Sequence, residues 1–324
     1  MNRVLHELAN RGLYGVQFQR ASVSKFVVRW ILRLGLGTAF EWGIIAIVLS
    51  EITVLLISVI FTTYNSPAWL EKVLWGFHAQ SDRGFEIVIA DDGSGEATRT
   101  VIEAFERESD LSVQHVWHPD DGFQKCRILN KAVVAAKGEY LVVTDGDCVP
   151  RSDFVSVHRQ QAEPGCFLSG GYFKLPLDTS KAISRDDIES GRCFDKAWLR
   201  QSGVPASTNF MKLTATPWMS RWLNRLTPTK STWNGHNASA WKSDALSVNG
   251  FDERLQYGGL DREFGERLVN LGIRPKQIRY SAITVHLDHP RGYASEEGWA
   301  ANHAIRKHVR DHKVIETPNG IRQL

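Results

Sequence analysis

The sequence predicts an α/β fold with a mostly parallel central sheet flanked by helices. From residue 57 onward, short apolar and β-branched segments alternate with helical segments, a spacing typical of repeated strand–helix units. Two of the predicted strands end in acidic residues, at the edge where open parallel sheets bind ligands. A chain of 324 residues accommodates this pattern as one large domain or two smaller ones.

The first half of the pattern is regular. Ser66 and Pro67 mark one helix start, because proline is favoured at the first helical position. In chain order we expect a strand at 57–61, a helix from 67, a strand at 85–90, a helix at 96–108, a strand at 113–117, a helix at 126–136 and a strand at 139–144.

After residue 150 the regular alternation of strands and helices ends, and we expect a smaller region of mixed strands and helices. Gly258 and Gly259 lead into a helix that Gly272 ends. The other expectations are a strand at 166–174, a basic, tryptophan-containing loop or lid at 212–230, a polar, turn-rich segment at 233–241, a final strand at 278–287 and a helix at 296–310.

Asp145, Gly146 and Asp147 form the most informative motif. They follow a buried strand, and carboxylates two residues apart in an extended chain point to the same side, roughly 7 Å apart. Gly146 adds no side chain, so a phosphate or another backbone can approach closely. Two carboxylates hold a divalent cation well, and the cation can bind phosphate oxygens. The motif therefore predicts a metal-assisted phosphate site.

Composition limits the class of protein. The net charge of +3 is too small to indicate a nucleic-acid partner, and we expect none. The four cysteines lack C-x-x-C spacing, which argues against a disulfide scaffold or a zinc site and fits a reducing compartment. We therefore expect a cytoplasmic protein.

The N-terminal 1–55 segment is basic and hydrophobic. Residues 24–36 fit a basic amphipathic helix lying on an anionic membrane. The apolar run at 43–61 is a poor membrane span, because Glu51 interrupts it and its last residues form the first strand. We expect peripheral membrane contact through residues 20–50, on the inner face of the plasma membrane; a buried segment and an incorrectly assigned start are the alternatives.

Four sequence segments, in order, resemble the inverting family 2 glycosyltransferases of the GT-A fold. They are ISVIFTTYN at 57–65, VIADDGS at 88–94, FQKCRILNKAVVAAKGEYLVVTDGDCVP at 123–150 and WNGHNASAWKSDALSVNGFDERLQYGGLDREF at 233–264. The last is similar to the galactosyltransferase-type C-terminal segment of bacterial enzymes that build lipopolysaccharide, capsule or other glycans. The resemblance covers roughly residues 57–291 and implies a GT-A, Rossmann-like fold.

The resemblance also implies roles for individual residues. Asp261 would be the catalytic base, and Leu260 stands where the family usually has a glutamate that contacts the acceptor. The UDP-sugar donor would contact Thr62, Tyr64, Asp92, Lys125, Arg127 and Asp145. The metal, Mn²⁺ or Mg²⁺, would bind Asp145 and Asp147, with His286 or His289 completing its coordination, and the acceptor would contact Trp233, Asn234, Gly235 and Gly259.

The implied function is transfer of a hexose or N-acetylhexosamine from a UDP-sugar to a glycan or lipid-linked acceptor, with inversion. The implied organisation is an N-terminal extension at 1–55, a nucleotide-sugar-binding half at 56–160, an acceptor-binding and catalytic half at 161–291 and a helical tail at 292–324. An added imidazole ligand favours Mn²⁺ over Mg²⁺. The sequence does not determine the sugar.

The same residues also have plainer uses. Asp145, Asp147 and the Asp91–Ser94 run could be strand-closing turns, and Asp261 could cap its helix. Arg127 could be a solvated charge, and the two histidines could be structural. Two other functions also stay open: a haloacid-dehalogenase-type phosphohydrolase with Asp145 as nucleophile, and a non-catalytic glycan-binding relative.

Overall fold

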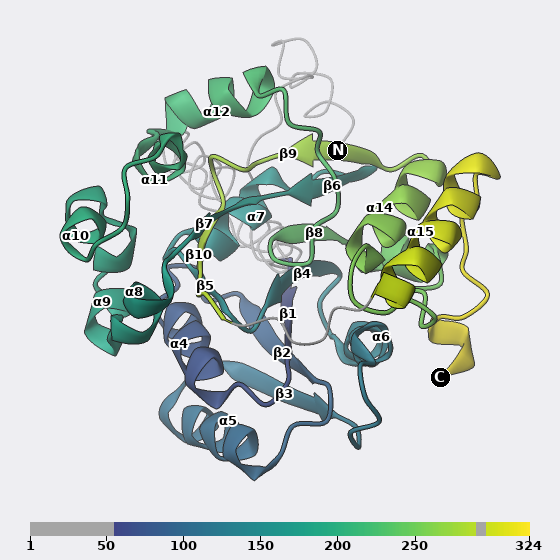
Figure 1. The fold of residues 1–324 in the computed structure, drawn as a ribbon, viewed down its shortest axis with the longest axis horizontal. Coiled ribbons are helices and arrows are strands. Elements are labelled where there is room, and N and C mark those ends of the chain that lie inside the picture. Colours follow the sequence, from purple (N-terminus) through teal and green to yellow (C-terminus); the bar gives the residue numbers. More distant parts are fainter. Residues whose placement is uncertain (1–54, 290–295) are drawn as a thin grey trace, which may run out of the picture. The chain divides into compact units, whose positions relative to one another are not determined.

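A computed structural model describes residues 55–289 and 296–324 (Figure 1). Residues 55–324 form one compact unit. The membrane contact expected at 20–50, and all but the last residue of the extension expected at 1–55, lie outside the described residues. Among the helices that the structure does describe, none is long and apolar enough to cross a membrane.

A seven-stranded, mostly parallel sheet forms the centre of the unit, as the sequence predicts. Its order is β3-β2-β1-β4-β8-β6-β9, with the first four strands parallel and β8 antiparallel to both of its neighbours. The strands are β1 (Ile57–Thr63), β2 (Phe85–Asp91), β3 (Ser112–Trp117), β4 (Tyr140–Asp145), β6 (Cys166–Ser169), β8 (Ala238–Trp241) and β9 (Arg274–Gln277).

Helices cover both faces of this sheet (Figure 1). In β1, Val59 and Phe61 pack in one buried cluster with α4 (Pro67–His78) and α5 (Glu96–Glu108). Ile60 points the other way and packs in a second cluster with α6 (Lys125–Ala135). Alternate residues of an extended strand face opposite sides, so an uninterrupted apolar strand is buried on both.

A second, three-stranded sheet brings distant segments together. Its order is β5-β10-β7, from β5 (Cys148–Pro150), β10 (Ile283–His286) and β7 (Gly171–Lys174). The single strand expected at 166–174 is therefore wrong, because β6 and β7 belong to different sheets. They separate at Gly170, where a Cβ would overlap the side chain of Asn237. The strand expected at 278–287 is likewise shorter, and its pairing begins only at Ile283.

The segment expected as a loop or lid at 212–230 is largely helical, so that prediction is wrong. It contains α11 (Met211–Thr214) and α12 (Pro217–Leu226). Thr216 caps α12 by accepting a hydrogen bond from the Met219 amide, and Pro217 takes the first helical position. Further helices not expected from the sequence are α7 (Phe154–Gln161), α8 (Leu177–Ala182), α9 (Arg185–Glu189), α10 (Lys196–Gln201) and α13 (Lys242–Ser247).

Two helices close the C-terminal side. They are α14 (Leu260–Asn270) and α15 (Glu296–Asp311), the latter confirming the helix expected at 296–310. Gly259, with φ of 96°, is the N-cap of α14, and Asp261 lies within its first turn. The plainer reading of Asp261 as the capping residue is therefore wrong.

A fully buried ion pair stabilises α14. The Arg267 guanidinium donates two hydrogen bonds to Glu263, at 2.6 and 2.9 Å, and also contacts the carbonyls of Val248 and Gly250. Neither side chain of the pair is exposed to solvent. A single charge left in this position would have no partner and no water.

We therefore expect Arg267→Leu to lower the free energy of unfolding by about 3–5 kcal/mol, because it leaves the Glu263 charge buried and unpaired. Urea denaturation measures the effect. The double variant Glu263→Leu/Arg267→Leu removes both charges and should recover much of the loss. Equal instability of the single and double variants would contradict this account.

Candidate active site

The carboxyl ends of the parallel strands converge on one edge of the sheet. The register places Thr62 of β1 opposite Asp145 of β4, and Thr63 opposite Asp91 of β2. After β4 the chain turns sharply: the Gly146 amide donates to the Thr62 carbonyl at 2.9 Å. A Cβ on Gly146 would lie 2.6 Å from that carbonyl oxygen, so only glycine fits this turn.

Asp145 is engaged by the protein itself. Lys125 Nζ, from the first turn of α6, donates to Asp145 Oδ1 at 2.7 Å, and Thr62 Oγ1 contacts the same oxygen at 3.3 Å. Burial alone would raise the pKa of Asp145, but the Lys125 charge outweighs it and holds that pKa below its ordinary value. Asp145 is therefore an ionised, fixed carboxylate.

Asp147 belongs to a different cluster. His289 Nε2 lies 2.8 Å and His286 Nε2 3.8 Å from Asp147 Oδ2. The two imidazole rings are nearly parallel, with centroids 6.0 Å apart, and the buried His286 Nδ1 has no hydrogen-bond partner among the described residues. A carboxylate with two imidazoles, all offering donor atoms within 4.8 Å of one another, fits a divalent transition metal.

The neighbouring thiol does not extend this ligand set. Cys148 Sγ donates to Asp147 Oδ1 at 3.3 Å, and burial raises the pKa of Cys148 well above its ordinary value. Cys148 falls in a second group, with Asp145 and Asp147, that is separate from the group with both imidazoles. The group with the imidazoles offers oxygen and nitrogen donors only.

Asp261 faces the same region from the start of α14. Burial raises the pKa of Asp261 to about 6, even though the nearby Lys125 charge favours the ionised form. Its Oδ1 is buried and has no hydrogen-bond partner in the described residues. Gly235 makes room for this carboxylate, because a Cβ there would lie 2.6 Å from Asp261 Oδ1. A buried carboxyl that titrates near neutrality suits proton transfer.

Asp92, expected at the uracil, is buried at the end of β2. His118 Nε2 lies 2.8 Å from Asp92 Oδ1, and the Gln124 amide donates to Asp92 Oδ2 at 3.0 Å. Tyr64, expected beside it, is half exposed and donates from its hydroxyl to Asp120 Oδ2 at 2.8 Å. The structure thus ties Asp92 to the start of α6 and leaves Tyr64 facing solvent.

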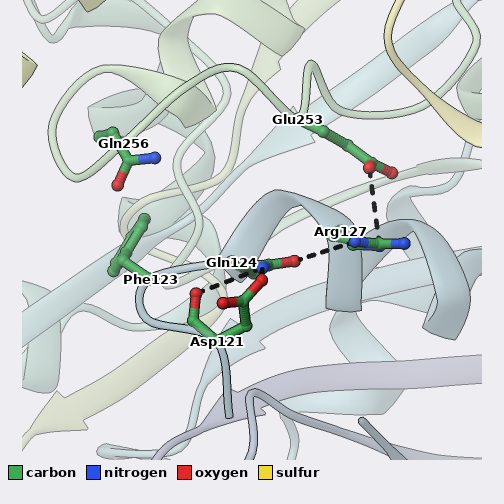
Figure 2. A pocket seen from close by; sticks show the side chains of 6 residues that line it. All are labelled: Asp121, Phe123, Gln124, Arg127, Glu253 and Gln256. Atoms are coloured by element: carbon green, nitrogen blue, oxygen red, sulfur yellow. Dashed lines mark hydrogen bonds and ion pairs between the residues drawn. The ribbon is translucent and has the colours of Figure 1, made fainter. Parts of the chain in front are cut away.

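Arg127 lies apart from the Asp145 ion pair. Figure 2 shows it between Gln124, at 3.3 Å, and Glu253, at 3.9 Å. These three residues help to line a pocket of about 330 Å³, together with Asp121, Phe123 and Gln256. Lys125 and Arg127 were both expected near the diphosphate, and of these two Lys125 is the one that contacts Asp145.

The residues expected to bind the acceptor separate into two groups. Trp233 is 2% exposed, and its ring packs against Phe264 and Phe167 in the core, so the structure does not present it to a ligand. Asn234 contacts the Ser169 hydroxyl and the Asn237 amide. Gly235 and Gly259 stay next to Asp261, the former against its carboxylate and the latter as the cap of its helix.

Two aromatic residues at the site were missed by the sequence reasoning. The Tyr172 ring packs against His236, with centroids 4.5 Å apart, and against His286, at 5.6 Å. Burial lowers the pKa of His236 to about 4, so it is neutral at physiological pH. His236 belongs to the 233–264 segment that carries the resemblance, but Tyr172 had no sequence signal.

The C-terminal helix holds the loop that precedes Asp261. Asn302 of α15 donates to the carbonyls of Gln256, Tyr257 and Gly258, at 2.8, 3.2 and 2.6 Å, and accepts from the Gln256 amide at 3.1 Å. Asn302 itself is 1% exposed. The expected helical tail therefore supports the loop that enters α14.

Comparisons with known proteins agree with this architecture. Residues 58–171 match the profile of the family described as "Glycosyl transferase family 2". The uncharacterized glycosyltransferase YfnE of Bacillus subtilis is 24% identical over 277 residues, which cover 76% of this chain and 68% of YfnE. Chondroitin synthase of Escherichia coli is 26% identical over 274 residues, but the match covers only 38% of that protein and 80% of this chain.

A solved structure shows the same fold. The structure of GalNAc-T7 with UDP, GalNAc and Mn²⁺ superimposes on 80% of this chain and 48% of that chain, with a TM-score of 0.53 and 14% identity. The phosphohydrolase alternative is not favoured by any of these matches, and the galactosyltransferase-type character of the C-terminal segment is not confirmed. The profile match, the relatives and the fold together support a family 2 glycosyltransferase, with the family 2 domain at residues 58–171.

Proposed function

We propose that this glycosyltransferase transfers a hexose or N-acetylhexosamine from a UDP-sugar to a glycan or lipid-linked acceptor, with inversion and with Asp261 as the base. One observation carries the proposal. A buried carboxyl with its pKa raised to about 6 lies beside the Lys125–Asp145 ion pair, at the sheet edge that also carries the Asp147–His286–His289 cluster.

Donor binding is assigned to the ends of β1, β2 and β4. Asp145 is held ionised and immobile by Lys125, as a hydrogen-bond acceptor for ribose hydroxyls requires. GalNAc-T7, which shares this fold, was solved with UDP and Mn²⁺. We assign Thr62, Tyr64 and Asp92 to the nucleoside and Lys125 to the diphosphate, with Arg127 farther out in the pocket of Figure 2.

The metal is assigned to Asp147, His286 and His289. The mixed oxygen and nitrogen donor set favours Mn²⁺ over Mg²⁺, which prefers oxygen ligands alone. A bound cation would supply Lewis-acid stabilisation to the leaving diphosphate. The protein's own part is to place both imidazoles and the Asp147 carboxylate around one point.

Proton transfer is assigned to Asp261. The acceptor hydroxyl must lose its proton as it attacks, and a buried carboxylate with an unpartnered oxygen can accept it. A single base opposite the leaving group corresponds to direct displacement, which turns an α-linked donor into a β-linked product. Asn234, Gly235 and Gly259 would then line the acceptor side, with the Trp233 ring supporting them from the core.

Replacement of Asp261 tests the proposal. We expect Asp261→Asn to lower transfer by about 10²–10⁴-fold, because the amide cannot accept the proton that the proposal assigns to this carboxylate. Donor binding should persist, and a rise in melting temperature with UDP-sugar and Mn²⁺ measures it. Because ionisation of this buried carboxyl opposes folding above its pKa, the variant should melt no lower than the wild type at neutral pH.

The matched control for this variant is Asp244→Asn, a carboxylate on α13 whose pKa is also raised by burial. It should leave transfer unchanged. Near-normal transfer by Asp261→Asn would remove Asp261 from the role. Phosphate release that survives Asp261→Asn and disappears in Asp145→Asn would instead indicate a phosphohydrolase, and donor binding without UDP release on any acceptor would indicate a non-catalytic relative.

The pH dependence gives an independent check. The base must be ionised, so kcat/KM should fall about tenfold per pH unit below about pH 6. Lys125 lowers the pKa of Asp261, and Lys125→Met should therefore move this acidic limb to higher pH as well as weakening donor binding. The exposed Lys137→Met variant is the control. A limb that stays in place without Lys125 would show that a different group titrates.

Metal binding can be measured without turnover. We expect Asp147→Asn and His289→Ala to weaken Mn²⁺ binding at least about tenfold, because each removes a donor atom from the cluster. Electron paramagnetic resonance of free Mn²⁺ measures this. The exposed His303→Ala on α15 should bind as the wild type does, and unchanged affinity in the first two variants would place the metal elsewhere.

A further inference from the structure

The helix α12 attaches to the protein through its polar side. Ser220, which is 3% exposed, donates to the Tyr280 carbonyl at 2.7 Å. Asn224 accepts from the Tyr280 amide at 3.0 Å and donates to the Ser281 hydroxyl at 2.9 Å. A surface helix of a globular protein normally buries its apolar stripe instead. In α12, by contrast, the polar side faces the protein.

The apolar side of α12 faces solvent as a result. Trp218, Met219, Trp222 and Leu226 are 69, 39, 50 and 73% exposed. Spacings of four residues place Trp218, Trp222 and Leu226 along one stripe of the helix. A contiguous exposed apolar stripe of this kind marks a contact surface, because nothing in the described fold covers it.

Positively charged side chains lie on the same helix as the stripe. Arg221 and Arg225 are on the same helix and exposed. Residues 196–243 contain no aspartate or glutamate at all, although the whole chain has 36. The same segment carries Lys196, Arg200, Lys212, Arg221, Arg225, Lys230 and Lys242. Such a separation of charge favours an anionic partner.

We propose that α12 is a membrane-contacting helix that lies in the headgroup region of an anionic bilayer. Trp218 and Trp222 combine an apolar ring with a polar N–H, the character of side chains at membrane interfaces. Burial of Leu226 and Met219 requires an apolar environment, which a bilayer offers and a soluble polyanionic glycan does not. Arg221 and Arg225 would meet the lipid phosphates.

The position of α12 relates this surface to the active site. Tyr280 and Ser281, which hold the helix, immediately precede β10, the strand that ends in His286. Lys212 of the adjacent α11 donates to the carbonyl of Tyr172, whose ring packs against His286. In Figure 1, α11 and α12 lie together at the upper left edge. A lipid-linked acceptor would thus enter close to the metal cluster, a consequence that rests on the proposed function; the membrane contact itself does not.

A site-specific probe tests the contact in the full chain. The four native cysteines are buried, so Leu226→Cys provides one exposed thiol for an environment-sensitive fluorophore. Vesicles of phosphatidylcholine with 30% phosphatidylglycerol should shift its emission to the blue and allow quenching by lipid-borne nitroxides. The probe reports on α12 even where other parts of the chain also bind lipid. The assay contains no sugar nucleotide, so its result is independent of transfer activity.

The matched control is Val134→Cys on α6, which is 51% exposed and outside the basic segment; it should show no shift. Arg221→Gln/Arg225→Gln in the Leu226→Cys background should reduce the response to anionic vesicles several-fold. The absence of any shift at position 226 would overturn the proposal. So would an equal shift with pure phosphatidylcholine, or an equal shift with heparin, which would identify a neutral surface or a polyanionic glycan as the partner.

Discussion

The ion pair between Lys125 and Asp145 is the interaction on which the rest of the site depends. Asp145, Asp147 and Asp261 all act electrostatically on Lys125, whose ammonium group is hydrogen-bonded to Asp145. Burial alone would lower the pKa of Lys125, but these carboxylates raise it above its ordinary value. Lys125 therefore stays charged, and its charge offsets the repulsion among the three carboxylates.

The same cation divides the carboxylates into two functional states. Asp145 touches Lys125 directly, and its pKa is lowered. Asp261 is affected by Lys125 without being hydrogen-bonded to it, and burial prevails, so its pKa is raised to about 6. Two chemically identical groups within one site thus differ in protonation behaviour. Under the proposed function, the ionised Asp145 holds the donor and Asp261 gains and loses a proton.

The parts of the fold that the sequence could predict are those in which local pattern and tertiary packing agree. The helix expected at 96–108 has a clear helical periodicity, and the strands that became β1, β2 and β4 are apolar runs that are buried on both faces of the sheet. The strands of the C-terminal half could not be predicted in the same way. β6, β7, β9 and β10 are four residues long each, so their pairing depends on distant partners and on Gly170 fitting beside Asn237.

The site was predictable to a similar extent. The D-x-D motif and Asp261 had local signals, whereas Tyr172 became part of the site only because β7 pairs with β10. Trp233 had the opposite outcome. Its neighbours in the sequence carry the resemblance, but its ring packs between Phe167 and Phe264 in the core. The sequence alone does not distinguish a tryptophan that binds a sugar from one that is buried in a core.

Leu260 shows how this chain departs from the family that it resembles. The resemblance places a glutamate at this position, where it would contact the acceptor. Here Leu260 is 3% exposed and packs in the cluster formed by α6, Trp233 and Phe264. A carboxylate at the same place would be buried among these apolar side chains, which carries a desolvation cost unless the carboxylate finds a partner. Asp261, one residue later, is then the acidic side chain of this turn that faces the Lys125–Asp145 pair. Under the proposed function, acceptor recognition then depends on other groups near Asp261, and the neutral His236 with its partner Tyr172, which packs against His286, is one candidate.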